Sequence, residues 1–166
     1  IYASGAVTAT RSTFSSNKVT GDSAGGAIFS AHKVTLEDST FNNNSIQRSY
    51  GGAIYTYGDI TATRTNFSNN TAGSSGGAIC SSGGNITLTD TNFSGNISNT
   101  GPGGAIYMYG VPSTLRFTTT IPITLNPSST RSSGDNDIAS TNSGNLITFV
   151  KDGNSTLTLN TRNEHW

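Results

Sequence analysis

The chain has 166 residues, enough for one domain, and its formal net charge is zero. Hydrophobic residues make up 32% and charged residues 11%, whereas Ser, Thr, Asn and Gly number 24, 26, 18 and 20. The zero net charge argues against a nucleic-acid partner, because phosphate binding needs a basic surface. No run approaches 18 apolar residues, so we predict no membrane insertion by this segment.

The first residues, "IYASGAVTATRSTF", begin where a Gly-Gly-Ala motif would just have ended. The chain therefore opens in the middle of a repeat unit. Either it is a piece of a longer protein, or its open end is covered by another subunit. An open end of stacked strands exposes unpaired edges, so head-to-tail self-association into a filament is one prediction.

Two motifs then alternate along the chain with one shared period. The first is Gly-Gly-Ala-Ile, which starts at Gly25, Gly51, Gly76 and Gly103. The second is Phe-x-x-Asn, which occurs once between successive glycine pairs. A nearly fixed period in the twenties is typical of a solenoid.

Each unit contains an alternating run of constant length. In the run that starts at Ile60, Ile60 and Ala62 alternate with Thr61 and Thr63, which predicts one buried and one solvated face. The residues after the glycine pair predict a second short strand, and Phe-x-x-Asn a third strand or a corner. We therefore predict a parallel β-helix with three short strands per coil and about 26 residues per coil.

Stacking in register places like side chains over one another, which predicts three structural ladders. The asparagine ladder would bond through its side-chain amides. The residues alone leave open which of the Ala and Ile after each glycine pair points inward. The predicted ladder residues are Phe14, Phe41, Phe67 and Phe93; Asn17, Asn44, Asn70 and Asn96; and Ile28, Ile54, Ile79 and Ile106.

Residues 111–166 lose both motifs but still alternate, as in "STLRFTTTIPITLN", "NLITFV" and "STLTLN". We predict regular coils over residues 1–110. Over 111–166 we predict degenerate coils and a C-terminal cap of the same solenoid, with loops at 126–136 and 140–145. Terminal repeats are commonly atypical because they cap the core.

The combined motifs resemble the repeats of chlamydial polymorphic outer-membrane proteins, over residues 1 to about 109. This resemblance implies a right-handed parallel β-helix that is secreted and displayed on a cell surface. It also implies a passenger domain that adheres to cells, with a host-cell or surface receptor or a glycan as partner. The family's C-terminal translocating barrel has no counterpart in this sequence.

Charged residues offer two candidate sites with chemistry. Asp38, Arg64, Asp90 and Arg11 occupy equivalent positions of successive units, where a polysaccharide-cleaving β-helix could use them. Cross-strand ion pairing is the alternative, and we predict no catalytic residue.

The segment "GDNDIAS", from Gly134, offers oxygen ligands for calcium but lacks the calcium-loop frames. An Asx-rich turn is the alternative. His32 and His165 have no ligand spacing. We predict no metal and no cofactor.

Aromatic residues suggest a contact surface. Phe29, Tyr55 and Tyr107 share one slot, and Tyr57 and Tyr109 follow two residues later. The four tyrosines could bind a sugar or a protein partner, or could form a ladder that stiffens the solenoid. Cys80 occupies the same slot, as a small buried residue if the slot faces inward and as a free thiol if it faces outward.

Outward threonines support a different function. Thr8-x-Thr10, Thr61-x-Thr63 and Thr87-x-Thr89 would form a flat array similar to that of ice-binding solenoids, interrupted by Thr35-x-Glu37. Threonine is also common at outward strand positions. The favoured prediction is a non-catalytic extracellular β-solenoid that acts as a surface adhesin or a structural, filament-forming display protein. Ice binding and polysaccharide binding or cleavage are the alternatives.

Overall fold

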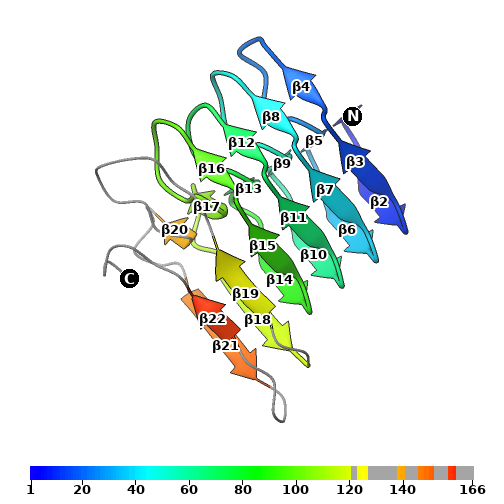
Figure 1. Cartoon of the computed structure of the whole chain (residues 1–166), viewed down its shortest axis with the longest axis vertical. Coiled ribbons are helices and arrows are strands. Elements are labelled where there is room, and N and C mark those ends of the chain that lie inside the picture. Colours follow the sequence, from blue (N-terminus) through cyan, green and yellow to red (C-terminus); the bar gives the residue numbers. More distant parts are fainter. Residues whose placement is uncertain (121–122, 127–137, 141–145, 152–156, 160–166) are drawn as a thin grey trace.

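A computed structural model shows that the chain coils into a parallel β-solenoid (Figure 1). The structure describes residues 1–120, 123–126, 138–140, 146–151 and 157–159, and these residues include no helix. Every paired strand runs parallel to its neighbour in the next coil, so that Ile60 lies opposite Ile86. The prediction of a parallel β-helix is confirmed, and so is its predicted coil length.

Four sheets, named A to D in the order in which the chain visits them, run along the solenoid. Sheet A contains β1 (Tyr2–Ala3), β5 (Ile28–Ser30), β9 (Ile54–Thr56), β13 (Ile79–Ser82), β17 (Ile106–Tyr109) and β20 (Ile138–Ser140). Sheet B contains β2 (Val7–Thr10), β6 (Val34–Glu37), β10 (Ile60–Thr63), β14 (Ile86–Thr89), β18 (Thr114–Thr119) and β21 (Leu146–Lys151).

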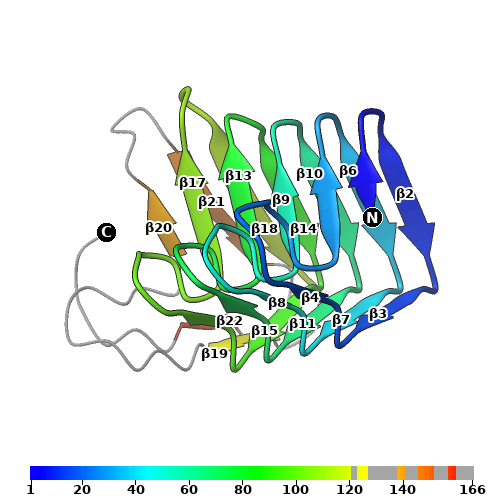
Figure 2. The ribbon, with the colours of Figure 1, turned by 90° about the horizontal axis from the view of Figure 1, so that it is seen from above.

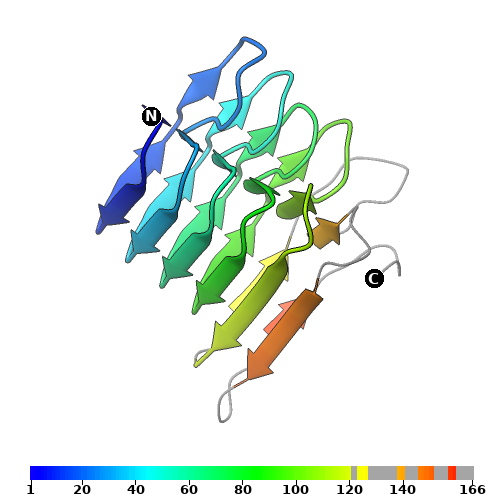
Figure 3. The ribbon, with the colours of Figure 1, turned by 180° about the vertical axis from the view of Figure 1, so that it is seen from behind.

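The remaining two sheets complete each coil. Sheet C contains β3 (Thr13–Ser15), β7 (Thr40–Asn42), β11 (Asn66–Ser68), β15 (Asn92–Ser94), β19 (Ile123–Asn126) and β22 (Leu157–Leu159). Sheet D contains β4 (Lys18–Val19), β8 (Ser45–Ile46), β12 (Thr71–Ala72) and β16 (Ile97–Ser98). Figures 2 and 3 show the strands of each sheet side by side in successive coils.

Sheet D adds a fourth short strand to the three predicted for each coil. Its strands have two residues each and directly follow the asparagine corner. The amide of Thr71 donates to the carbonyl of Asn44 at 2.8 Å, and the amide of Ile97 donates to Asn70 at 2.8 Å. The chain therefore stays in register for one step beyond the corner before it enters the loop.

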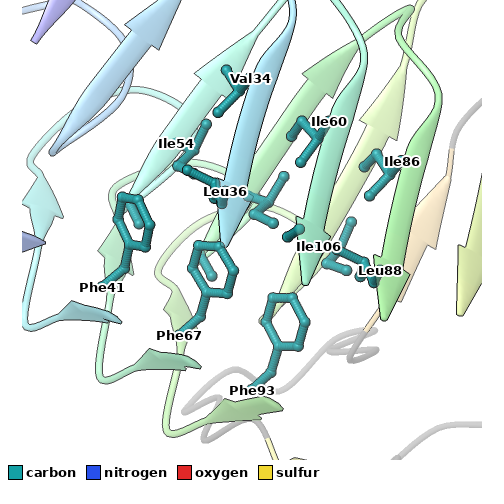
Figure 4. Close-up of a cluster of buried hydrophobic side chains, with 14 of the residues drawn as sticks. Val34, Leu36, Phe41, Ile54, Ile60, Phe67, Ile86, Leu88, Phe93 and Ile106 are labelled. Carbon is teal, nitrogen blue, oxygen red and sulfur yellow. The ribbon is translucent and has the colours of Figure 1, made fainter. Parts of the chain in front are cut away.

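The interior of the coil is filled by stacked apolar side chains (Figure 4). The inner phenylalanine column consists of Phe14, Phe41, Phe67 and Phe93, and the last three are fully buried. Successive rings stack with centroids 4.6, 4.9 and 4.9 Å apart. Because no coil can bury its apolar side alone, each ring depends on the coils above and below it.

The structure also shows which way the residues after each glycine pair point. Ala53 and Ile54 are both fully buried. The amides of Ala27 and Ile28 both donate to the carbonyl of Ala53, at 2.9 and 3.0 Å, so the chain bends there and turns two consecutive side chains inward. The question that the sequence left open is therefore settled, since Ala and Ile both face the core.

The glycine pair permits this corner in two ways. Gly51 has φ of 71°, in the left-handed region that side chains rarely adopt. Gly52 has a different constraint, because a Cβ there would overlap the backbone carbonyl oxygen of Gly77 in the next coil. The first glycine supplies the turn and the second the close approach between coils.

The asparagine corners are joined by a buried ladder of amides. The side-chain Nδ2 of Asn70 donates to Asn96 Oδ1 at 2.9 Å and to the carbonyl of Phe41 at 3.0 Å. Asn44 donates to Asn70 Oδ1 through its backbone amide at 3.0 Å and through Nδ2 at 2.9 Å. Each buried amide is thereby satisfied by the neighbouring coils.

The strands beyond residue 110 extend the same sheets. β18 pairs with β14, β19 pairs with β15, and β20 pairs with β17. The division at residue 110 stays a prediction, as does the C-terminal cap. Most of the predicted loops 126–136 and 140–145 lies outside the described residues, but residues 126 and 140 end strands β19 and β20.

Candidate functional site

The outer face of sheet A carries a column of mostly aromatic side chains. This outer aromatic column consists of Tyr2, Phe29, Tyr55, Cys80 and Tyr107, which strand register places at one position of successive coils. Tyr2 stacks on Phe29 with ring centroids 4.6 Å apart, and Phe29 stacks on Tyr55 at 5.6 Å. In β5 the column position lies between two buried residues, so it faces away from the core.

Tyr57 and Tyr109, each two residues after a column position, widen this surface. Tyr57 is 52% exposed, and its ring stands at 81° to Phe29 and at 85° to Tyr55. The ring of Tyr109 stacks on Tyr107 at 5.4 Å, and its hydroxyl lies 2.6 Å from that of Tyr55. The structure thus brings the four tyrosines singled out from the sequence into one cluster.

Cys80 faces outward yet is fully buried. Tyr55 and Tyr107 lie one coil to either side of it, about 10 Å apart at the usual strand spacing. The ring of Tyr50, from the loop before β9, lies 6.4 Å from that of Tyr55 and 6.5 Å from that of Tyr107, so it spans the space that the small cysteine leaves. Burial raises the pKa of the Cys80 thiol, which therefore stays protonated and unreactive at neutral pH.

A cleft of about 320 Å³ opens over the outer aromatic column. Part of its lining comes from sheet A and the residue after β9, and the rest comes from the loops that precede β5 and β9. Tyr107 does not line the cleft, but its ring stacks on that of Tyr109, which does. The lining residues are Tyr2, Asp22, Ser23, Ala24, Phe29, Ser49, Tyr50, Tyr55, Tyr57 and Tyr109.

The cleft carries little charge. Among the described residues that line it, Asp22 alone is charged; its side chain is 85% exposed, and its Oδ1 lies 3.9 Å from Arg48 Nη1. Burial and the hydrogen bond with Tyr109 raise the pKa of the Tyr55 hydroxyl, so this group stays neutral. The lining therefore offers mainly ring surfaces and neutral hydroxyls.

Some lining residues were missed at the level of sequence. Tyr2 could have been found, because it precedes Phe29 by one repeat period. Tyr50, Asp22 and Ser49 lie in loops of variable length, where no periodic signal marks a shared position.

The charged residues that were weighed for catalysis form a column at the corner after sheet B. Arg11, Asp38, Arg64 and Asp90 all have positive φ, between 46° and 49°. Arg64 Nε donates to Asp38 Oδ1 at 2.6 Å, and its Nη2 donates to Asp38 Oδ2 at 3.0 Å and to Glu37 Oε1 at 2.8 Å. The guanidinium of Arg64 lowers the pKa of Asp38, which therefore stays ionised and ill-suited to act as a general acid.

The outer face of sheet B carries the predicted threonines. Register places Thr8, Thr35, Thr61 and Thr87 in one file. A parallel file contains Thr10, Thr63 and Thr89, with Glu37 between the first two. The array therefore extends over four coils, with Glu37 interrupting its second file and Arg116 following Thr87 in the first.

The other candidates contribute no site to the described part of the chain. No three His, Cys, Asp or Glu side chains of the described residues come close enough together to hold a metal ion. His32 is exposed. The possible calcium ligands Asp135, Asn136 and Asp137 lie outside the described residues, as does His165.

Comparisons with known proteins identify the repeat. A family model described as the Chlamydia polymorphic membrane protein repeat matches residues 11–31, 38–57, 64–82 and 90–109. Each matched segment contains one Phe-x-x-Asn motif and the Gly-Gly-Ala-Ile that follows it. No curated protein and no solved structure gave a significant match. Among the described residues there is no helix that could span a membrane.

Proposed function

Because the chain belongs to the family of Chlamydia polymorphic membrane protein repeats, a family of surface proteins, we propose that it is an adhesin that contacts its partner through the aromatic cleft. The family and the solenoid fold fit a non-catalytic protein displayed on a cell surface. In this proposal the stacked coils hold the cleft rigidly in place, outside the cell.

The observation that carries the proposal is the gathering of exposed aromatic rings at the cleft. Tyr2, Tyr50 and Tyr57 are 76%, 36% and 52% exposed, and all three line it. Tyrosine is enriched at protein contact surfaces because its ring is large and rigid and its hydroxyl is polar. The outer face of sheet B presents mainly threonines, with Glu37 and Arg116, so among the described residues the exposed rings of the cleft have no counterpart on that face.

The ion pairs at the corner after sheet B support a non-catalytic role. A hydrolase that cleaves glycosidic bonds typically needs one carboxyl group with a raised pKa to protonate the leaving group. Asp38 instead has a lowered pKa and a two-point contact with Arg64. A broad polysaccharide panel, assayed with and without calcium, should therefore show no depolymerisation.

Adhesion can be tested with beads that carry the purified chain. Wild-type beads should adhere to cultured cells above the level of uncoated beads. The Tyr57→Ala variant should lose most of this adhesion. Apart from Tyr2 on the terminal strand β1, Tyr57 is the most exposed of the tyrosines that line the cleft. Thr61→Ala, on the other side of the coil, is the matched control and should adhere like wild type. Equal adhesion of wild-type and Tyr57→Ala beads would contradict the proposal.

The threonine array favours ice binding as a second candidate. Its two files lie on one flat sheet, with strands about 4.8 Å apart and alternate residues of one strand about 6.6 Å apart. Measurement of thermal hysteresis tests this candidate. A freezing-point gap above that of an ordinary protein solution, abolished by Thr61→Tyr, would support it. An absence of hysteresis in the wild-type protein would end it.

A further inference from the structure

We infer that the aromatic cleft binds the end of a neutral glycan, with one sugar ring stacked on Tyr57. This inference rests on the proposed function, because it names the class of partner that the adhesive surface takes. Its three supports are the orientation of the rings, the hydroxyl groups of the lining and the near-neutral charge of the cleft.

Ring orientation sets Tyr57 apart from the stacked rings of the outer aromatic column. Phe29 lies between Tyr2 and Tyr55, with ring planes inclined by 6° and 4°, so both of its faces are occupied. Tyr57 stands nearly perpendicular to Phe29 and Tyr55 and is 52% exposed, so it does not join that stack. A pyranose ring presents C–H groups on its faces, which pack against the negative face of an aromatic ring.

The lining also supplies the polar groups that a sugar requires. Five tyrosines, together with Ser23 and Ser49, line the cleft, so most of its lining residues carry a hydroxyl group. The hydroxyls of Tyr55 and Tyr109 are 2.6 Å apart, so one of the two phenol protons is used between them. Hydroxyl groups both donate and accept, as sugar hydroxyls do, so each ring edge can be satisfied in more than one orientation.

Charge distinguishes a neutral sugar from the other ligands that aromatic surfaces bind. A sulfated or sialylated glycan would find no cation among the described residues of the lining, and Asp22 would repel it. A quaternary ammonium group would meet a single carboxylate, which is 85% exposed and already lies near Arg48. A volume of about 320 Å³ lies at the small end of ligand pockets, so the cleft has room for a short glycan end of one or two rings.

Saturation-transfer NMR on the full chain tests the inference directly. The probes are neutral methyl hexosides, methyl N-acetylhexosaminides and neutral disaccharides, compared with sialyllactose, a heparin disaccharide and tetramethylammonium. At least one neutral probe should show transfer to its ring protons and bind with a measurable affinity. Tyr57→Ala should weaken that affinity at least about tenfold, whereas Tyr57→Phe, which keeps the ring, should stay within about threefold. Thr61→Ala should leave it unchanged.

Three outcomes would overturn the inference. They are transfer to no neutral probe, transfer to the charged probes only, and neutral binding that survives Tyr57→Ala in a variant with a wild-type circular dichroism spectrum. Bead adhesion to cells treated with glycosidases separates this failure from failure of the proposed function. Adhesion that depends on Tyr57 but not on cell-surface glycans would contradict glycan binding and leave the proposed adhesin function intact. No adhesion to untreated cells would contradict the proposed adhesin function itself.

Discussion

The inner phenylalanine column and the outer aromatic column are built by the same stacking but differ in regularity. In the inner column the first four coils all place phenylalanine at one position, with centroids 4.6 to 4.9 Å apart, and Leu125 follows in the next coil. In the outer column tyrosine, phenylalanine and cysteine occupy one position. The ring centroids are 4.6 Å apart between Tyr2 and Phe29 but 5.6 Å apart between Phe29 and Tyr55. In both columns, successive residues belong to successive coils.

The difference shows where the solenoid tolerates change. Inside, each ring fills a space that two other coils define, so a change in size at one position disturbs its neighbours. Outside, a neighbouring loop can compensate, as Tyr50 does over Cys80. The interior therefore maintains the register, and the exterior is free to vary and to carry a binding surface.

Truncation of the inner column should have the largest effect. Phe67 is fully buried and stacks on both neighbours at 4.9 Å. Phe67→Ala should lower the free energy of unfolding by about 3–5 kcal/mol, because the cavity cannot collapse between fixed coils. Urea denaturation followed by circular dichroism measures it. Tyr57→Ala, an exposed aromatic truncation, is the control and should cost under about 1 kcal/mol. Equal losses in the two variants would refute the contrast between inside and outside.

The asparagine ladder should show the same contrast along its length. Asn70 is fully buried, and Asn70→Ala removes the side-chain acceptor of two donors of Asn44 and the side-chain hydrogen bond to the carbonyl of Phe41. The expected cost is about 3 kcal/mol, from buried polar groups left unsatisfied. Asn17 is exposed and donates only to Asn44, so Asn17→Ala should cost about 1 kcal/mol or less. Similar costs measured by urea denaturation would show that burial is not what gives the ladder its strength.

The interior could be predicted from the sequence because every coil repeats the same packing environment. Because stacking repeats one environment at every coil, Phe41, Phe67 and Phe93 share a residue type and a period. The two-residue strands of sheet D escaped prediction because Lys18, Ser45, Thr71 and Ile97 have no type in common. Backbone hydrogen bonds hold them in register, and their buried second residue varies from Ile46 to Ala72 and Ser98, so no single residue type marks them.

The candidate site could be predicted only in part. Tyr55, Tyr57 and Tyr109 lie on the periodic strands or next to them, so their spacing in the sequence predicted that they share one surface. Tyr50 and Asp22 lie in loops whose lengths vary, and their positions over sheet A depend on contacts between coils. Periodicity predicts the wall of the cleft that belongs to the sheet, but not the wall that belongs to the loops.

Because Tyr50 spans the space beside Cys80, we predict that this one side chain shields the thiol from solvent. In the wild-type protein Cys80 should react slowly with a thiol reagent such as dithionitrobenzoate, because it is fully buried and its pKa is raised. Tyr50→Ala should speed the reaction at least about tenfold while the fold persists, since Tyr50 is a surface residue with 36% exposure. Tyr57→Ala should leave the rate near that of wild type. An unchanged rate in Tyr50→Ala would mean that other groups cover the thiol.

The charged corner should give the smallest effect, because its ion pairs are exposed to water. Arg64 lowers the pKa of Asp38 below its ordinary value of 3.8 in the folded protein. A carboxyl group whose pKa is lowered by folding stabilises the native state above its unfolded pKa, and this contribution disappears as the pH falls through the folded pKa. Arg64→Ala should therefore raise the Asp38 pKa towards 3.8 in an NMR titration and slightly reduce the loss of Tm between pH 7 and about pH 2. Arg48→Ala, which removes the looser 3.9 Å pair with Asp22, is the matched control and should leave the Asp38 titration unchanged. A pKa of Asp38 that stays low without Arg64 would contradict this assignment and would leave Arg11, the other cation that lowers the pKa of Asp38, as the cause.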